Sequence, residues 1–215
     1  MQELRDFWKK LESGSDIRGV AVEGAAGEPV TLTSDVVAKL GQAYVKWLHN
    51  KTGLPPQEMK VAVGHDSRIS AERLREAVIH GITETGASVV DCGLATTPSM
   101  FMTTIDLACT GAVEITASHH PYHRNGLKFF TRGGGLDKGD IREILATAQA
   151  QYGLEKAHVK GFVVPVRYLD AYSKHLREMI CRGVNVQEYD KPRKGFHIVV
   201  DAGNGAGGFY AHEVL

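Results

Sequence analysis

A serine stands between two apolar segments, among neighbours that could support chemistry on its hydroxyl group. Ser118 lies in the stretch Thr-Ala-Ser-His-His-Pro at 116–121, and Asn-Gly-Leu-Lys follows at 125–128. Pro121 and Gly126 keep the intervening backbone out of regular structure. The hydroxyl group is therefore expected on a loop at the mouth of a sheet, beside several side chains that can carry positive charge.

Three interpretations of Ser118 follow from its type and surroundings. It is an ordinary polar loop residue, a hydrolase nucleophile activated by a histidine base, or the carrier of a phosphoryl group. The usual hydrolase signature has glycine two residues away on either side of the serine, and neither position is glycine here. A phosphoryl group would bring a charge of about −1.5 to −2. Lys128, Arg124, protonated histidines and a divalent cation could neutralise that charge.

The segment around Ser118 resembles the phosphoserine loop of the α-D-phosphohexomutases, the phosphoglucomutases and phosphomannomutases, which usually reads Thr-Ala-Ser-His-Asn-Pro. Three further stretches resemble motifs of that family in the same order: Asp-Ile-Arg-Gly at 16–19, Val-Gly-His-Asp-Ser-Arg at 63–68, and the opening of the second domain at 199–208. The four matches are in register and extend over nearly all of the chain. Together they are far more specific than one tetrapeptide.

The sequence also departs from the family pattern. His120 stands where the family usually has Asn, and His65 stands where it has Arg, so each position has a side chain of different shape and charge. Three later motifs are absent: the metal loop Asp-Gly-Asp-Gly-Asp-Arg, the sugar-reading Gly-Glu-x-Ser-Gly and the phosphate loop Arg-x-Ser-Gly-Thr. We therefore expect an N-terminal portion of a mutase that is inactive alone and needs the remaining mutase domains as partners.

The resemblance implies an enzyme that interconverts a hexose 1-phosphate and a hexose 6-phosphate through phosphoserine at Ser118. A hexose 1,6-bisphosphate would be the intermediate and the activator. The resemblance also implies Lys128 as general acid/base, Arg18 as partner of the loop or the transferring phosphoryl group, and His119 as the residue that orients the loop. Mg²⁺ would contact a phosphoryl oxygen on Ser118. Substrate and phosphate contacts are expected from Arg68, His120, Asn125 and Gly126. The sequence names neither the hexose (glucose, mannose or glucosamine) nor the oligomeric state.

An alternative from another class is a non-catalytic phosphosugar-binding or assembly module, which the missing metal loop favours. Two more motifs suggest other ligands. Residues 203–208 fit Gly-x-Gly-x-x-Gly, a dinucleotide fingerprint that requires a strand before it and a helix after it. His119, His120 and His123 suggest zinc, but Pro121 breaks any helix that would align the first with the last.

Composition limits the remaining classes. The chain has 25 acidic and 25 basic residues, a balance that argues against a general nucleic-acid-binding protein. Its three widely spaced cysteines indicate free thiols in a reducing compartment. No signal-peptide core and no run of the ~20 apolar residues needed to span a membrane is visible. A cytoplasmic protein without a membrane partner is expected.

Alternating strands and helices must position these residues. Strands are expected at 60–63, at 87–91, up to Ser118 and at 127–130. Amphipathic helices separate or follow them, and their expected caps include Ser34, Ser70 and Asp137. This alternation predicts an α/β fold with a mainly parallel, mixed sheet and crossover helices on both faces. Ligands gather at the carboxyl ends of such strands, so Arg68 and Ser118 are expected to share one crevice.

A linker is expected over residues 152–164. It divides the chain into a phosphoserine-bearing domain at 1–155 and the incomplete start of a second α/β domain at 156–215. The second unit is expected to hold a helix from Tyr168 and a strand at 196–200. Such a unit is too small to bury much apolar surface by itself.

Overall fold

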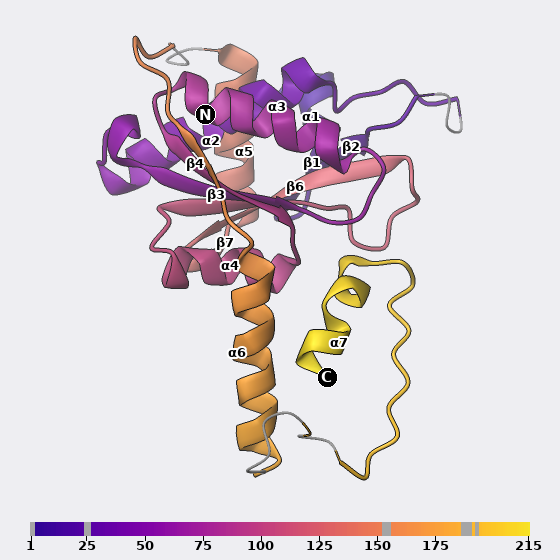
Figure 1. The fold of residues 1–215 in the computed structure, drawn as a ribbon. Coiled ribbons are helices and arrows are strands. Elements are labelled where there is room, and N and C mark those ends of the chain that lie inside the picture. Colours follow the sequence, from indigo (N-terminus) through magenta and orange to yellow (C-terminus); the bar gives the residue numbers. More distant parts are fainter. Residues whose placement is uncertain (1–2, 24–26, 152–155, 186–190, 192–193) are drawn as a thin grey trace.

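The computed structural model describes residues 3–23, 27–151, 156–185, 191 and 194–215. One mixed sheet of eight strands runs through it in the order β1-β2-β6-β5-β3-β4-β8, with β7 paired to β6 (Figure 1). The strands are β1 Glu12–Ser13, β2 Asp16–Val20, β3 Lys60–His65, β4 Ser88–Leu94, β5 Gly111–Ile115, β6 Arg124–Thr131, β7 Gly134–Gly135 and β8 Val163–Pro165.

Helices connect the parallel strands β5, β3, β4 and β8, whereas β6, β2 and β1 pair antiparallel. The α-helices are α1 Asp6–Lys9, α2 Ser34–Thr52, α3 Ala71–Glu84, α4 Thr97–Asp106, α5 Lys138–Ala150, α6 Tyr168–Gly183 and α7 Ala211–Val214. In the part of the chain that the structure describes, none of them combines the length and apolar character needed to cross a bilayer. The expected α/β fold is confirmed.

Side-chain alternation along the strands divides the core into two layers. In β5, Val113 and Ile115 pack with α2, α3 and α5 on one face, while Ala112 packs with the residues of α4 and α6 on the other. Figure 1 shows these two groups of helices on opposite sides of the sheet. The expectation of helices on both faces is therefore confirmed, and Glu114 lies on the α4 face by the same alternation.

Two helix starts differ in detail from the expected caps. Thr33, not Ser34, caps α2, because its hydroxyl group accepts the N–H of Val36. Ser70 precedes α3 without a capping hydrogen bond, since its hydroxyl group instead accepts a hydrogen bond from the side chain of Asn125. The hydrogen bond between Asn125 and Ser70 links β6 to the start of α3.

The segment after α5 departs from expectation in two places. The proposed domain boundary at 155/156 adjoins residues 152–155, which lie outside the described residues, and it stays a prediction. The last residues of the expected linker belong to β8. This strand pairs in parallel with β4, and Val163 of β8 is the partner of Val89 of β4. The expected strand at 196–200 is wrong. These residues have no ladder partner among the described strands and their apolar side chains are exposed, and a strand without a hydrogen-bonding neighbour is not stable.

Candidate active site around Ser118

The backbone of Ser118 adopts a conformation that few residues other than glycine adopt. Ser118 follows the end of β5 by three residues, is exposed, and has φ 54°, in the left-handed region. That region costs a non-glycine residue about 1–2 kcal/mol. Such strain persists only where the surroundings hold the chain in place, and it concentrates at functional sites.

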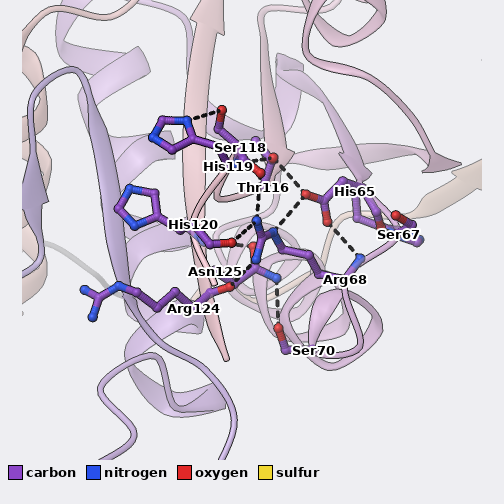
Figure 2. Close-up of polar contacts among 12 residues, drawn as sticks. His65, Ser67, Arg68, Ser70, Thr116, Ser118, His119, His120, Arg124 and Asn125 are labelled. Atoms are coloured by element: carbon purple, nitrogen blue, oxygen red, sulfur yellow. Dashed lines mark hydrogen bonds and ion pairs between the residues drawn. The ribbon is translucent and has the colours of Figure 1, made fainter. Parts of the chain in front are cut away.

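Arg68 holds this loop in place from the turn between β3 and α3. Its guanidinium group donates to four backbone carbonyl oxygens, those of Ser118 and His120 at 2.7 Å, Pro121 at 2.8 Å and Arg124 at 3.0 Å (Figure 2). Its Nε lies 3.3 Å from Oδ2 of Asp66. In this structure Arg68 thus binds the backbone of the loop, and its expected contact with a phosphate group stays a prediction.

A second connection runs through Thr116. Its hydroxyl group accepts the N–H of Ser118 at 3.1 Å and donates to Oδ2 of Asp66 at 2.8 Å. The other oxygen of Asp66 accepts the N–H of Arg68 at 3.0 Å. Hydrogen bonds therefore connect the turns that follow β3 and β5. This agrees with the expectation that Arg68 and Ser118 share one crevice at the carboxyl ends of the strands. Sequence reasoning assigned no role to Asp66 or Thr116, although both lie inside the matched motifs.

Asn125 and Gly126 lie beneath the loop. The Asn125 side chain is fully buried, donates to Oγ of Ser70 at 2.9 Å and accepts the N–H of Gly126 at 2.8 Å. A Cβ atom at position 126 would come within 2.5 Å of the carbonyl oxygen of Ile17. Close packing of β6 against β2 thus requires glycine there. Both residues shape the support of the loop, and their expected contact with substrate stays a prediction.

Lys128 and Arg18 share one buried carboxylate. Nζ of Lys128 donates to Oδ1 of Asp16 at 2.6 Å, and Nη2 of Arg18 donates to Oδ2 at 2.8 Å. Asp16 is the first residue of the matched Asp-Ile-Arg-Gly stretch, and sequence reasoning did not single it out. The side chains of Lys128, Arg18 and Asp16, two cations and one anion, together carry one net positive charge.

The histidines next to Ser118 differ in environment. Nδ1 of His119 lies 3.3 Å from Oγ of Ser118, and its ring stacks on that of His120 at a centroid distance of 5.3 Å. Burial, and then the positive charge of Arg18, lower the pKa of His120, so its ring is uncharged at neutral pH. Among the described residues, no carboxylate hydrogen bonds to His119 in the manner of a hydrolase triad, and no group of three or more His, Cys, Asp or Glu side chains could hold a metal ion.

A cavity of about 580 Å³ opens beside Ser118. Asp66, Glu114, Thr116 and the first residues of α4 line it on one side, and the glycine-rich turn 203–207 lines it on the other. Oγ of Ser67 donates to the carbonyl oxygen of Asn204 at 2.7 Å, which ties this turn to the site. No strand precedes the turn in the described residues and only short helices follow it, so the context of a dinucleotide fingerprint is not met.

Comparisons with family models and with individual proteins both find phosphoglucomutases and phosphomannomutases. The family model described as "Phosphoglucomutase/phosphomannomutase, alpha/beta/alpha domain I" matches residues 9–166. A phosphomannomutase of Vibrio cholerae is 31% identical over 185 residues, which make up 85% of this chain and 37% of the relative. A phosphoglucomutase of Neisseria gonorrhoeae is 31% identical over 210 residues, 98% of this chain and 40% of the relative. The chain thus spans well under half the length of these relatives.

Solved structures show the same fold. A phosphoglucomutase/phosphomannomutase family protein of Burkholderia thailandensis superposes with a TM-score of 0.64 at 24% identity, over 79% of this chain and 36% of that one. The phosphoglucomutase parafusin of Paramecium, in an open form, superposes with a TM-score of 0.58 at 19% identity, over 99% of this chain and 42% of that one. At these identities the likeness concerns the fold.

Proposed function

Because the chain belongs to the phosphoglucomutase/phosphomannomutase family, we propose that it supplies the phosphoserine-bearing part of an enzyme that interconverts a hexose 1-phosphate and a hexose 6-phosphate. One observation supports this most. The exposed hydroxyl group of Ser118 is held in a left-handed backbone conformation by Arg68. A serine that carries a group through a reaction needs such a fixed position.

In the proposed reaction, phosphorylated Ser118 donates its phosphoryl group to the free hydroxyl group of a bound hexose monophosphate. The bond between Oγ and phosphorus breaks, a bond from the sugar oxygen to phosphorus forms, and the hydroxyl proton passes to Lys128 in its amine form. The resulting 1,6-bisphosphate turns around and returns its other phosphoryl group to Ser118. Lys128 then returns the proton to the sugar oxygen that leaves. General acid/base transfer of this kind suits phosphoryl chemistry.

The charges around the loop suit a phosphoryl group. It would carry about −1.5 to −2, against the positive charge of Arg18 and, while it holds a proton, that of Lys128. Bound Mg²⁺ would neutralise further charge on the phosphoryl oxygens. From this chain the contact would be the phosphoryl oxygen on Ser118, and we propose that the remaining mutase domains supply the other ligands. Arg68 and His119 would orient the loop.

Phosphopeptide mapping tests the proposal. The complete enzyme is incubated with glucose 1,6-bisphosphate and digested, and the phosphate is located by mass spectrometry. We expect phosphate on Ser118 and its loss in Ser118→Ala. The matched control is Ser67→Ala, because Ser67 lines the same cavity but donates to Asn204. Phosphate on Ser67 or on any other residue would overturn the proposal.

We further propose that residues 1–215 do not turn over alone. The observation in favour is that the chain spans only 37% and 40% of the two mutases compared above. The assay supplies glucose 1-phosphate, the bisphosphate and magnesium and follows glucose 6-phosphate. Robust turnover by residues 1–215 would contradict this. The alternative, a non-catalytic phosphosugar-binding or assembly module, would be favoured if Ser118→Ala left the activity of the complete protein unchanged.

A further inference from the structure

One row of side chains crosses four neighbouring strands on the α4 face of the sheet. Backbone pairing places Asp16 of β2 beside Lys128 of β6, and Lys128 beside Glu114 of β5. Gly64 of β3 is the next member of the row. Because paired residues of adjacent strands point to the same face, Lys128 lies between two carboxyl groups, those of Asp16 and Glu114.

Only one of these two carboxyl groups, that of Asp16, is paired with a cation. Asp16 accepts from Lys128 at 2.6 Å and also from Arg18. The Glu114 residue is 1% exposed, its Oε2 is buried without a partner, and its carboxyl group makes no hydrogen bond or ion pair within the described part of the chain. Burial, together with the negative charge of Asp66, raises the pKa of Glu114 well above its ordinary value, which favours the protonated carboxyl group.

The two carboxyl groups lie on different sides of the site. Glu114 lines the cavity that also contains Ser118, whereas Lys128 and Asp16 do not line it. The strand order places β5 between β6 and β3, and β5 leads directly to Ser118. The ion pair with Asp16 therefore holds the lysine on the side of β6 that faces away from the serine-bearing strand.

We propose that Glu114 is the second acceptor of the Lys128 ammonium group, and that Lys128, once it has taken up the hydroxyl proton, moves from Asp16 to Glu114 before it returns that proton to the leaving sugar oxygen. This inference rests on the acid/base role proposed above for Lys128. The flexible stem and three rotatable donors of lysine permit such an exchange, and Asp16 keeps Arg18 as its partner. As the ammonium group arrives, Glu114 releases its carboxyl proton to water in the cavity, which leaves a carboxylate and an ammonium ion in contact.

The surroundings of Glu114 set the pH dependence of the exchange. Burial and the negative charge of Asp66 oppose ionisation of Glu114. Arg68 and His120 line the same cavity, and His120 is uncharged at neutral pH. The lining residues of α4 and the turn 203–207 carry no titratable side chain. Because the Glu114-paired state requires a carboxylate, its population rises with pH.

Glu114→Gln in the complete enzyme is the first test, since the amide keeps the shape of the side chain but cannot ionise. We expect kcat to fall by roughly 10-fold or more, KM to change by less than about threefold, and the acid-side ionisation in the pH profile of kcat to disappear. The control is Glu76→Gln, an exposed carboxylate on α3. An unchanged kcat and pH profile in Glu114→Gln would overturn the proposal.

Glu114→Met guards against a merely structural effect. An apolar side chain of similar size removes an unpartnered buried polar group, so the midpoint of urea unfolding should rise while kcat falls. A structural role would make stability and kcat fall together. That result, or a normal kcat in this variant, would count against the proposal.

A third measurement separates this inference from the proposed function. In residues 1–215, the ¹⁵Nζ resonance of Lys128 should titrate together with Glu114 in the native sequence, lose that titration in Glu114→Gln, and shift toward the Glu114-paired state in Asp16→Asn. If the Lys128 resonance does not change with the ionisation of Glu114, the proposed pairing is overturned. If the pairing is seen but Lys128→Met turns over normally, the acid/base role fails instead, and with it the purpose proposed for the exchange.

Discussion

The guanidinium group of Arg68 donates a hydrogen bond of 2.7 Å to the carbonyl oxygen of Ser118, which lies 50 positions away in the sequence. The same group binds three further carbonyl oxygens of the loop. A side chain on the turn after β3 thus maintains the strained backbone of Ser118, three residues beyond the end of β5. Loop geometry at Ser118 therefore depends on a side chain that is distant in the sequence as well as on the residues within the loop.

Replacement of Arg68 by lysine should uncouple the loop. A single ammonium group cannot reproduce the planar fork that reaches four acceptors, so Ser118 would lose its fixed position. Misplacement of reacting groups by about 1 Å can cost on the order of 10²-fold in rate, and we expect a fall of that size in kcat. Arg132→Lys, at an exposed turn residue, is the control. Equal rates in the two variants would show that Arg68 does not position the loop.

Glycine at position 118 should relieve backbone strain. Ser118 has φ 54°, which costs a residue with a Cβ atom about 1–2 kcal/mol, while glycine loses more chain entropy on folding, by roughly 0.5–1 kcal/mol. Ser118→Gly should therefore be more stable than Ser118→Ala by about 0.5–1 kcal/mol, measured by urea unfolding of residues 1–215. An alanine variant of equal or greater stability would mean that the position is unstrained.

Lys128→Met should lower turnover far more than substrate binding. A positioned acid/base group contributes typically ~10²–10⁴ in rate, whereas Arg18 remains on Asp16 to attract the phosphate. The measurement is kcat and the dissociation constant of hexose phosphate for the complete enzyme. Lys39→Met is the control, because Lys39 forms only an exposed ion pair with Asp35. Turnover within a few-fold of the native enzyme would leave Lys128 as a structural charge.

Glu84 should make stability sensitive to acid. Lys160 and Lys156 pair with this buried carboxylate and lower its pKa from an ordinary 4.5 to about 2. A lowered folded-state pKa contributes stability that is present above about pH 4.5 and is lost as the pH falls toward 2. Glu84→Gln should be less stable at neutral pH and should lose less stability over that interval.

Urea unfolding midpoints at several pH values check this prediction. Glu76→Gln, at an exposed position of the same helix, should follow the native pH dependence. Both lysines belong to the segment that leads to β8, so the native pH dependence should also appear in hydrogen exchange there. Identical pH slopes for the native chain and Glu84→Gln would show that this ion pair adds no stability.

Local sequence was sufficient for those features whose causes are local. The matched stretch around Ser118, the apolar strands and the amphipathic helices predicted both the α/β fold and the placement of Ser118 after a strand. Asp137 caps α5 as expected, because a cap needs only a side chain and an N–H three residues later. Arg68 and Ser118 share one crevice because parallel strands end at the same edge of a sheet.

Tertiary structure decided the features that depend on distant partners. Segments 163–165 and 196–200 are both apolar and extended, but only the first meets the free edge of β4 and becomes a strand. Likewise, Asp16 and Glu114 are both carboxyl groups in strands beside Lys128, yet one is paired and the other is buried alone. Composition and periodicity describe one segment at a time. Strand pairing and charge pairing depend on which segments the fold brings together, so only the folded chain reveals that Lys128 stands between an occupied carboxylate and a vacant one.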